Sequence, residues 1–206
     1  MKFDIFNKII SITARRGSGK TKLVKHLLKL YRHMFDKVFL ICPSEFNQDY
    51  TKEELIPENQ IFYEYDEDWV LNLTKKMEQV NKGGVRKHIL LVLDDCLSDI
   101  TMRSSKIKSL RLLASRGRHM GISVIVTAQA LKMLSPLFRQ NSDYLFLGKL
   151  VRSDIENVAD EFRVGLSKKE FIKLIEDNAG IDYKFVVINN CGTNSDDLYG
   201  IVKVDI

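Results

Sequence analysis

A glycine-rich basic segment near the N-terminus has the residue types and the spacing that phosphate binding requires. It spans residues 14–21, reads ARRGSGKT, and follows the apolar run IISIT. Glycines let the backbone turn tightly, so successive N–H groups can point at phosphate oxygens, and a helix that begins near Lys20 adds its positive N-terminal end. In this arrangement Lys20 neutralises the β- and γ-phosphates of a nucleotide, and the Thr21 hydroxyl ligates Mg²⁺.

This nucleotide-binding prediction has one departure from the usual pattern. Ala14 stands where the first glycine is usual, which is a mild change if this residue keeps a negative φ. The alternative is an exposed basic turn. The apolar strand before the segment and the amphipathic helix after it, at 21–34, favour nucleotide binding, with ATP and Mg²⁺ as the cofactors. The residues expected to contact the nucleotide are Ala14, Arg15, Arg16, Gly17, Ser18, Gly19, Lys20 and Thr21.

Polar side chains at the ends of two further apolar strands can complete such a site. The run HILLVLDD ends in Asp94, expected to hold the water shell of Mg²⁺, and Asp95, expected to orient or deprotonate the attacking water. Asp95 could instead cap the following helix or only support the metal. Gln129 ends the run ISVIVTAQ and is expected to sense the γ-phosphate; the alternative is a hydrogen bond to a loop.

Apolar strands alternate with amphipathic helices over most of the chain. This alternation predicts a single α/β domain over residues 1–206, with a mainly parallel central sheet and helices on both faces. The runs YKFVVIN and LYGIVKVD near the C-terminus have no helix between them and predict an antiparallel hairpin at one edge. Strands are also expected at 37–43, 61–65, 88–95, 122–129 and 143–150, and helices at 21–34, 67–81, 104–115, 152–162 and 167–177.

Composition narrows the class of protein. The chain has 206 residues, of which 45% are hydrophobic, and only three prolines, which fits one domain without a linker. Cys42, Cys96 and Cys191 are odd in number and far apart, which fits a reducing compartment better than disulfides or a zinc site. We find neither a signal-peptide pattern nor an apolar run long enough to span a membrane. A net charge of +5 permits a polyanionic partner.

The order and spacing of four motifs resemble those of the FtsK–HerA superfamily of DNA-pumping ATPases. Within it, the sequence is most similar to the poxvirus-type virion genome-packaging ATPases of large DNA viruses, over residues 8–150, although Ala14, Arg15 and Arg16 depart from the family pattern. The resemblance implies a RecA-like P-loop fold of the additional-strand type, with a strand inserted between the loop strand and the acidic strand. It also implies a homo-oligomeric ring. The motifs are Lys20-Thr21, Asp94-Asp95, the GRH at 117–119 and the strand ending in Gln129.

In such a ring, ATP is hydrolysed at subunit interfaces, where an arginine of one subunit reaches the γ-phosphate of the next. Arg118 is the first candidate because it lies in the GRH match, followed by Arg116 and Arg139. The alternative is a solvated basic turn that binds only DNA or solvent. The resemblance further implies double-stranded DNA as a partner, with capsid or portal proteins, and a location in the virion or in the host-cell cytoplasm or viral factory. A chain that is not viral is expected in the cytoplasm.

Residues 101–120 hold six Lys or Arg and no acid, and Arg103, Lys106 and Lys108 are expected to contact DNA phosphates in the channel of the ring.

Two other functions would use the same phosphate-binding loop at 14–21. A small phosphotransferase, such as a nucleotide kinase, needs no water-activating acid, so Asp95 with Gln129 argues against it. A non-motor nucleotide switch lacks support from any switch-loop threonine or NKxD motif. The favoured function is ATP hydrolysis coupled to DNA translocation.

Overall fold

The structure is a computed structural model that describes residues 3–44, 50–84, 86–96, 107–192 and 197–204. The strands in these ranges are β1 (Ile9–Thr13), β2 (Lys37–Ile41), β3 (Ile61–Phe62), β4 (Ile89–Leu93), β5 (Ile122–Ala128), β6 (Tyr144–Leu147), β7 (Lys184–Asn189) and β8 (Tyr199–Lys203). The α-helices are α1 (Lys20–Tyr31), α2 (Glu67–Lys82), α3 (Lys108–Arg116), α4 (Pro136–Asn141), α5 (Arg152–Phe162) and α6 (Lys168–Asn178). None of the helices in these ranges is both long and apolar enough to cross a membrane.

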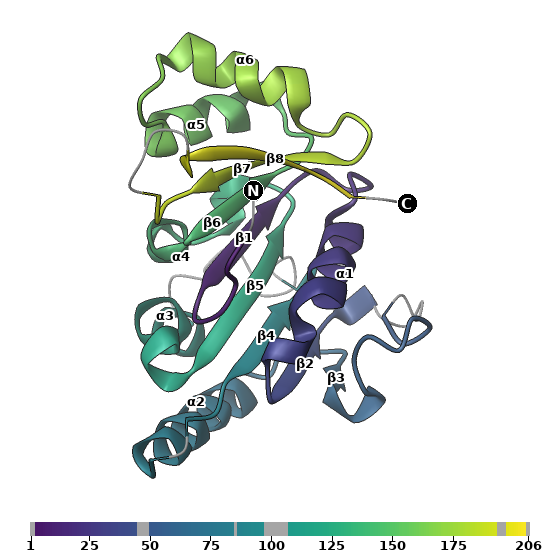
Figure 1. Cartoon of the computed structure of the whole chain (residues 1–206), viewed down its shortest axis with the longest axis vertical. Coiled ribbons are helices and arrows are strands. Elements are labelled where there is room, and N and C mark those ends of the chain that lie inside the picture. Colours follow the sequence, from purple (N-terminus) through teal and green to yellow (C-terminus); the bar gives the residue numbers. More distant parts are fainter. Residues whose placement is uncertain (1–2, 45–49, 85, 97–106, 193–196, 205–206) are drawn as a thin grey trace.

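Within the described ranges the strands form one eight-stranded sheet in the order β3-β2-β4-β5-β1-β6-β7-β8 (Figure 1). The pairs from β3 to β6 are parallel, whereas β7 pairs antiparallel with both β6 and β8. Strand β5 lies between β1 and β4, so the inserted strand that the resemblance implied is present. The predicted parallel centre and antiparallel C-terminal edge are confirmed.

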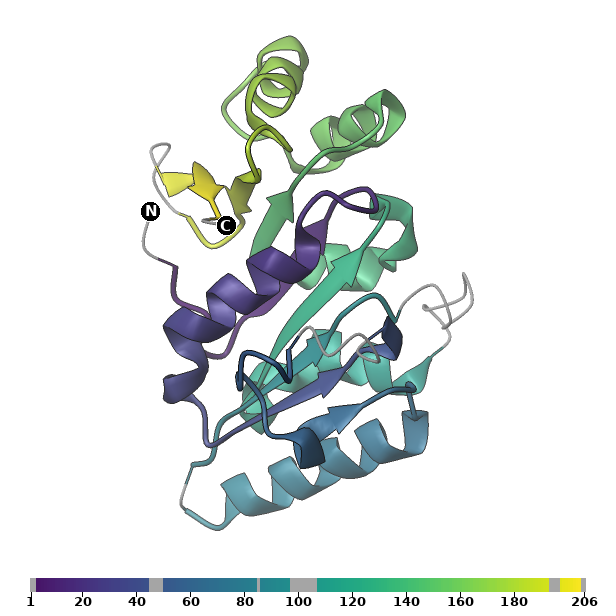
Figure 2. The ribbon, with the colours of Figure 1, turned by 90° about the vertical axis from the view of Figure 1, so that its right-hand side faces the viewer.

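The two faces of the sheet are covered by different helices, because side chains alternate along each strand. Ile10 and Ile12 of β1 pack in the same cluster as Leu23 and Leu27 of α1. Ile9 points to the opposite face, where it joins a cluster with α2, α3 and α4. Helices α5 and α6 continue that second layer over β6 and β7. Figure 2 shows α2 at the lower end of this arrangement and α5 and α6 at its upper end.

One helix of the described chain was not expected from the sequence. Helix α4 has only six residues, too few for a hydrophobic period to stand out. Its start is nevertheless marked, because the Ser135 side chain accepts a hydrogen bond from the N–H of Phe138 and Pro136 occupies the first turn. Local capping chemistry therefore identifies a helix that periodicity does not.

Several expected elements are shorter in the structure, most of all the strand expected at 61–65. The strand expected at 61–65 has only two residues, because the chain turns towards Asp66, whose side chain caps α2 by accepting the N–H of Trp69. The helix expected at 104–115 begins at Lys108 among the described residues. Its expected first residues, 104–106, lie outside the described ranges.

A tight turn at the amino-terminal edge of the sheet joins α3 to β5. It is a short 3-10 helix, η5 (Gly117–Met120), followed by Gly121, which has a φ of 72°. The Asn81 side chain of α2 fixes the turn by donating to the carbonyl oxygens of Met120, at 2.9 Å, and Lys87, at 3.0 Å. A Cβ at Gly121 would lie 2.4 Å from the Lys87 carbonyl oxygen, so only glycine fits.

We predict that Gly121→Ala lowers the free energy of unfolding by about 2 kcal/mol or more, because it combines a left-handed backbone with a clash against backbone. Gly165→Ala is the matched control, since Gly165 has a φ of 73° and no atom within 4 Å of a built Cβ. It should lose only about 1 kcal/mol. Urea unfolding of both variants measures the difference, and equal losses would contradict the packing argument.

Candidate nucleotide-binding site

The segment between β1 and α1 forms a loop at the carboxyl-terminal edge of the parallel strands. Gly17 and Gly19 have φ values of 73° and 88°, which let the backbone curl before α1 begins at Lys20. The Arg15 N–H donates to the carbonyl oxygen of Lys149 at 2.8 Å and so ties the loop to the end of β6. The first turn of α1 contains no acidic residue of its own, so its N–H groups remain available for an anion.

Ala14 fits the loop without strain. It is fully buried and does not have a positive φ, which is the condition under which the missing glycine is tolerable. Its methyl group occupies space that Gly148 leaves open: a Cβ at Gly148 would lie 2.7 Å from the Ala14 Cβ. The alanine is therefore matched by a glycine on the neighbouring strand end.

The Lys20 side chain lies inside the curl of the loop. Its Nζ donates to the carbonyl oxygens of Ala14, at 3.0 Å, and Arg15, at 3.3 Å. Only 8% of Lys20 is exposed, and this burial lowers the pKa of its ammonium, while the charges of Asp95 and Asp94 oppose the shift. The ammonium is thus held where the phosphates of a bound nucleotide need positive charge.

Asp94 is the centre of a hydroxyl network that joins several segments. Its carboxylate accepts hydrogen bonds from Thr21 at 3.0 Å, Tyr50 at 2.6 Å and Thr127 at 2.8 Å. Asp94 is 1% exposed, and burial raises the pKa of its carboxyl, whereas the three hydroxyl donors lower it and the Asp95 charge adds to the rise. The three donors compensate for placing this acid in the interior.

Asp95 and Gln129 meet directly beside this network. The Gln129 side-chain amide donates to the Asp95 carboxylate at 3.0 Å, and the Asp95 N–H donates to the Thr127 hydroxyl at 2.9 Å. Asp95 has a φ of 54°, a left-handed conformation that turns it out of the strand direction. The predicted proximity of the acid pair and the strand-end amide is therefore observed.

These groups line one cavity of about 360 Å³ with Lys20, Thr21 and Tyr183. Its donor set suits Mg²⁺, which prefers oxygen ligands and keeps several waters. The Thr21 hydroxyl and the Asp94 carboxylate, 3.0 Å apart, offer such oxygens. No cluster of three His, Cys, Asp or Glu side chains occurs among the residues described, so any Mg²⁺ here would depend on phosphate and water for its other ligands.

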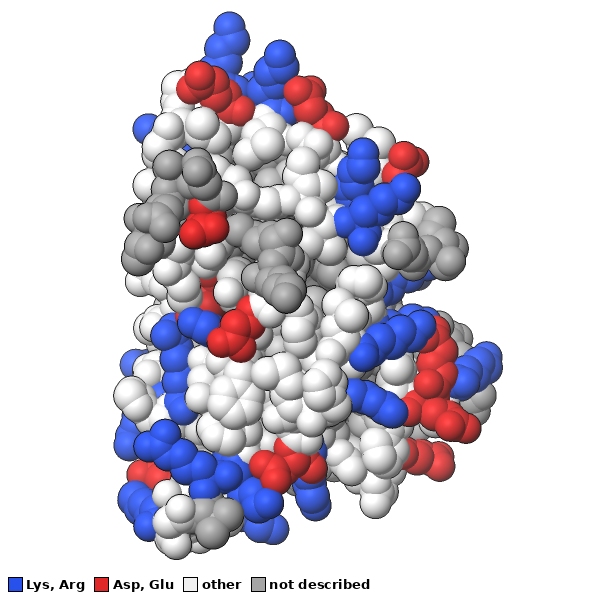
Figure 3. Space-filling model, viewed as in Figure 1, with Lys and Arg blue, Asp and Glu red and all other residues white. Residues whose placement is uncertain are grey.

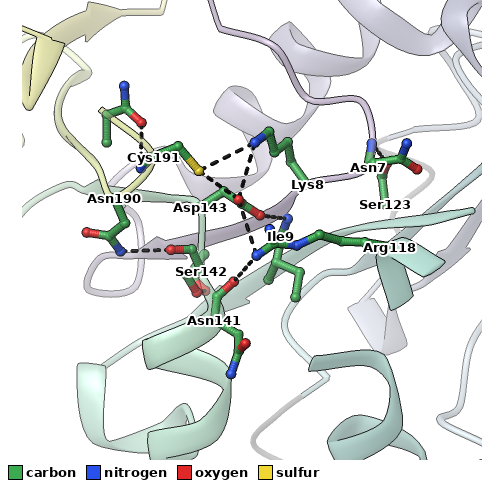
Figure 4. A network of polar contacts seen from close by, with 12 residues as sticks. Asn7, Lys8, Ile9, Arg118, Ser123, Asn141, Ser142, Asp143, Asn190 and Cys191 are labelled. Carbon is green, nitrogen blue, oxygen red and sulfur yellow. Dashed lines mark hydrogen bonds and ion pairs between the residues drawn. The ribbon is translucent and has the colours of Figure 1, made fainter. Parts of the chain in front are cut away.

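Arg118 lies at the opposite edge of the sheet from this cavity. It precedes β5, whereas the loop adjoins the last residue of that strand, Ala128, whose carbonyl oxygen accepts the Ala14 N–H at 3.1 Å. Seven strand residues span about 20 Å, so Arg118 cannot reach a phosphate held by its own chain. Its guanidinium lies 3.3 Å from the fully buried carboxylate of Asp143, which also attracts Lys8 at 3.4 Å (Figure 4).

The other expected arginines occupy different surroundings. Arg116 is 58% exposed and lies 3.6 Å from the Glu78 carboxylate. With Arg118 it lines a basic hollow of about 270 Å³ at the amino-terminal edge, where Figure 3 shows Lys and Arg side chains gathered at the lower left. Arg139 is held within its own chain, because it donates to Glu161 at 2.9 Å and to the Leu134 carbonyl oxygen at 2.7 Å.

The expected DNA contacts are only partly visible. Lys108 is exposed at the first residue of α3, where a cation is unfavourable next to the positive end of the helix. Arg103 and Lys106 lie outside the described residues. The segment therefore stays a prediction as a DNA-binding surface.

The family described as Poxvirus A32 protein matches residues 4–200. The chain belongs to this family. The resemblance to poxvirus-type packaging ATPases is thereby confirmed.

An uncharacterised protein of Acanthamoeba polyphaga mimivirus is 31% identical over 162 residues, 72% of this chain and 56% of that protein. DNA packaging protein OPG160 of vaccinia virus (strain Western Reserve) is 26% identical over 175 residues, 80% of this chain and 61% of the relative. The chain thus spans little more than half the length of these relatives.

Solved structures establish the fold class of this A32-family chain. The DNA-packaging ATPase B204 of Sulfolobus turreted icosahedral virus is similar with a TM-score of 0.72 at 14% identity, covering 98% of this chain and 100% of the other. The conjugation coupling protein TcpA of pCW3 matches with a TM-score of 0.65 at 15% identity, covering 100% of this chain and 63% of the other. At these identities the likeness shows the fold alone, and it confirms the predicted RecA-like P-loop architecture.

Tyr50, Thr127 and Tyr183 are among the residues of the site that were not expected from the sequence. Tyr50 lies in a polar loop with no motif, and Thr127 lies within a buried strand as one β-branched residue among several. Tyr183 precedes β7, far from the loop in sequence. Only for Thr127 was there a usable signal, since it stands two residues before Gln129 at a strand end next to the acid pair.

We predict that Lys20→Ala abolishes ATP binding by this A32-family chain, whereas Asp95→Asn binds ATP but slows hydrolysis by about 10²-fold or more, the usual size of a lost general base. Asparagine tolerates the left-handed backbone at this position, so the variant isolates the charge. Calorimetric titration and steady-state phosphate release measure the two steps. Asp68→Asn, on the exposed first turn of α2, is the control. A wild-type hydrolysis rate in Asp95→Asn would make Asp95 structural.

Proposed function

We propose that the chain is an ATPase motor that moves double-stranded DNA, most simply into a virion. The observation that carries this proposal is the meeting of a phosphate-binding loop, a buried acid and a second acid with its amide partner in one cavity. The Gln129 amide lies 3.0 Å from Asp95, and Thr21 lies 3.0 Å from Asp94. Membership of the A32 family and the DNA packaging protein of vaccinia virus among its relatives support the DNA part.

Each residue of the cavity has a distinct role in this proposal. The loop N–H groups and Lys20 bind the β- and γ-phosphates, and Lys20 exchanges its carbonyl contacts for phosphate oxygens. Thr21 and Asp94 would hold Mg²⁺, which would neutralise phosphate charge. Asp95 orients the attacking water and accepts its proton. Asp95 could instead cap a helix or only support the metal. Neither of these roles accounts for its hydrogen bond with Gln129, so we favour the catalytic role.

Gln129 connects the state of the nucleotide to the sheet. Its amide already donates to Asp95 at 3.0 Å, so it lies within reach of the group that handles the attacking water. Loss of the γ-phosphate removes negative charge that faces Asp95. The Gln129 side-chain amide would then change its hydrogen-bond partner. This change is transmitted directly to β5, at whose end Gln129 lies.

The proposed motor acts as a ring in which Arg118 serves the site of a neighbouring subunit. Because Arg118 lies at the amino-terminal edge and the cavity at the carboxyl-terminal edge, subunits must associate head to tail for the two to meet. Arg118 is 46% exposed despite its pairing with Asp143, which leaves its guanidinium accessible from outside. Arg116 is the second candidate on the same edge.

DNA is proposed to contact the segment that leads into α3. Lys108 lies at the positive end of its helix without an acidic residue in the first turn, a placement that phosphate contact would stabilise. Capsid or portal proteins would be the partners that receive the DNA. Such a protein works in the virion or in the host-cell cytoplasm where virions assemble.

The experiment that tests the proposed function measures ATP hydrolysis with and without double-stranded DNA over a range of protein concentrations. We expect DNA to stimulate the rate and specific activity to rise with protein concentration as rings form. Replacing Arg103, Lys106 and Lys108 together by Ala should lower DNA affinity and flatten its dependence on salt, by a log–log slope of about 0.9 per lost phosphate contact, with basal hydrolysis retained.

Matched substitutions elsewhere on the surface control for the loss of charge. Lys75→Ala, Lys76→Ala and Lys173→Ala also remove three positive charges, from exposed positions of α2 and α6. If both triple variants lose the same DNA affinity, the effect is one of net charge. An unchanged affinity and salt slope in the first variant would place DNA elsewhere.

We further predict that Arg118→Ala binds ATP normally but hydrolyses it about 10³-fold or more slowly, the usual effect of a lost arginine finger. Mixing decides whether the arginine acts in trans. A Lys20→Ala subunit still carries Arg118, and an Arg118→Ala subunit still carries Lys20, so mixed rings should recover part of the activity. No recovery in rings shown to be mixed would exclude Arg118 and turn attention to Arg116 or Arg139. A protein that stays monomeric with DNA and ATP would refute the ring.

A further inference from the structure

An aromatic ring from the C-terminal part of the chain lies against the phosphate loop. Tyr183 belongs to the turn between α6 and β7, which Figure 1 shows near the start of α1. The contact with Gly19 is so close that a Cβ built there would lie 2.6 Å from the Tyr183 Cδ1. Gly19 therefore serves two purposes, because it permits the left-handed turn and makes room for the ring.

The backbone that presents this ring is strained. Asp182 and Tyr183 have φ values of 48° and 55°, and two consecutive residues other than glycine rarely adopt this region. Hydrogen bonds hold the turn in place: the Lys184 N–H donates to the Ile181 carbonyl oxygen at 2.8 Å, and the Val204 N–H donates to that of Tyr183 at 3.2 Å. Such strain in a held turn points to a use for the side chain that the turn presents.

One face of the ring carries a positive charge rather than an apolar neighbour. The Lys22 ammonium lies over it, 4.2 Å from the ring centroid. Lys22 follows Thr21 directly on α1, so this face is turned towards the start of the helix and not into the core. The long lysine side chain can move away and leave the face open to a flat ligand.

We infer that Tyr183 stacks on the base of the nucleotide whose phosphates the loop binds, an inference that rests on the proposed ATP-binding function. The triphosphate is held by Lys20 and Thr21, and the rest of the nucleotide must extend along the cavity wall. Tyr183 is the aromatic side chain that lines the cavity within the described ranges. Stacking requires only a ring face, which every base has, so the contact is expected to accept adenine and guanine alike.

The experiment compares nucleotides with their phosphates alone. Calorimetric titration of ATP, GTP and inorganic tripolyphosphate, each with Mg²⁺, is performed on the whole chain and on Tyr183→Ala. Loss of one base-stacking contact should weaken ATP and GTP binding about tenfold and leave tripolyphosphate binding unchanged. Tyr183→Phe should retain wild-type affinity for all three ligands, because it keeps the ring.

Two further variants separate stacking from support of the loop. Tyr183→Leu keeps apolar bulk against Gly19 and should lose ATP affinity as Tyr183→Ala does, which serves as the test if the alanine variant does not fold. Ile181→Ala changes an exposed residue of the same turn and should bind like the wild type.

The outcomes distinguish this inference from the proposed function. Unchanged ATP affinity in folded Tyr183→Ala and Tyr183→Leu would overturn the stacking role. An equal loss of ATP and tripolyphosphate binding would overturn it too, because the ring would then only support the loop. By contrast, a wild-type chain that binds neither ligand, or a Lys20→Ala variant that binds tripolyphosphate normally, would refute the ATP-binding function itself.

Discussion

The carboxylate of Asp94 is the group on which the rest of the site depends. It is 1% exposed, and an acid in that position is costly unless each oxygen has a donor. Its three hydroxyl donors come from the start of α1, from the loop after β2 and from the end of β5. Thr21 and Tyr50 donate to one oxygen and Thr127 donates to the other, so the hydrogen bonds of this single group hold three separate segments together.

Strand order makes that meeting possible. Because β5 lies between β1 and β4, the ends of all three strands share one edge, and Thr127 can bridge Asp94 and Asp95. The left-handed backbone of Asp95 then directs its side chain towards Gln129. In open α/β sheets the crevice outside the carboxyl ends of the strands is where ligands bind, and these side chains meet at that edge.

Local signals in the sequence were enough for the loop, the acid pair and most of the sheet. The loop residues Gly17, Gly19 and Lys20 lie within four consecutive positions, and their chemistry depends on backbone geometry that neighbouring residues set. Tyr50 and Tyr183 could not be found in this way, because each reaches the site only through the tertiary fold. Periodicity also failed for α4, which is shorter than two helical turns. The proposed role of Arg118 could not be examined in this way, because it depends on contact between two copies of the chain.

Strand β5 links two places that the proposed ring would use at different interfaces. Gln129 adjoins its carboxyl end and the Arg118 turn its amino end, with seven residues between them that are buried along their whole length and paired on both sides. Close-packed interiors have low compressibility and transmit strain, so a shift at one end of this strand would be felt at the other. In a head-to-tail ring, the nucleotide state of each subunit would then affect the position of the arginine that it contributes to the neighbouring site. ATP hydrolysis would therefore proceed from subunit to subunit in one direction around the ring.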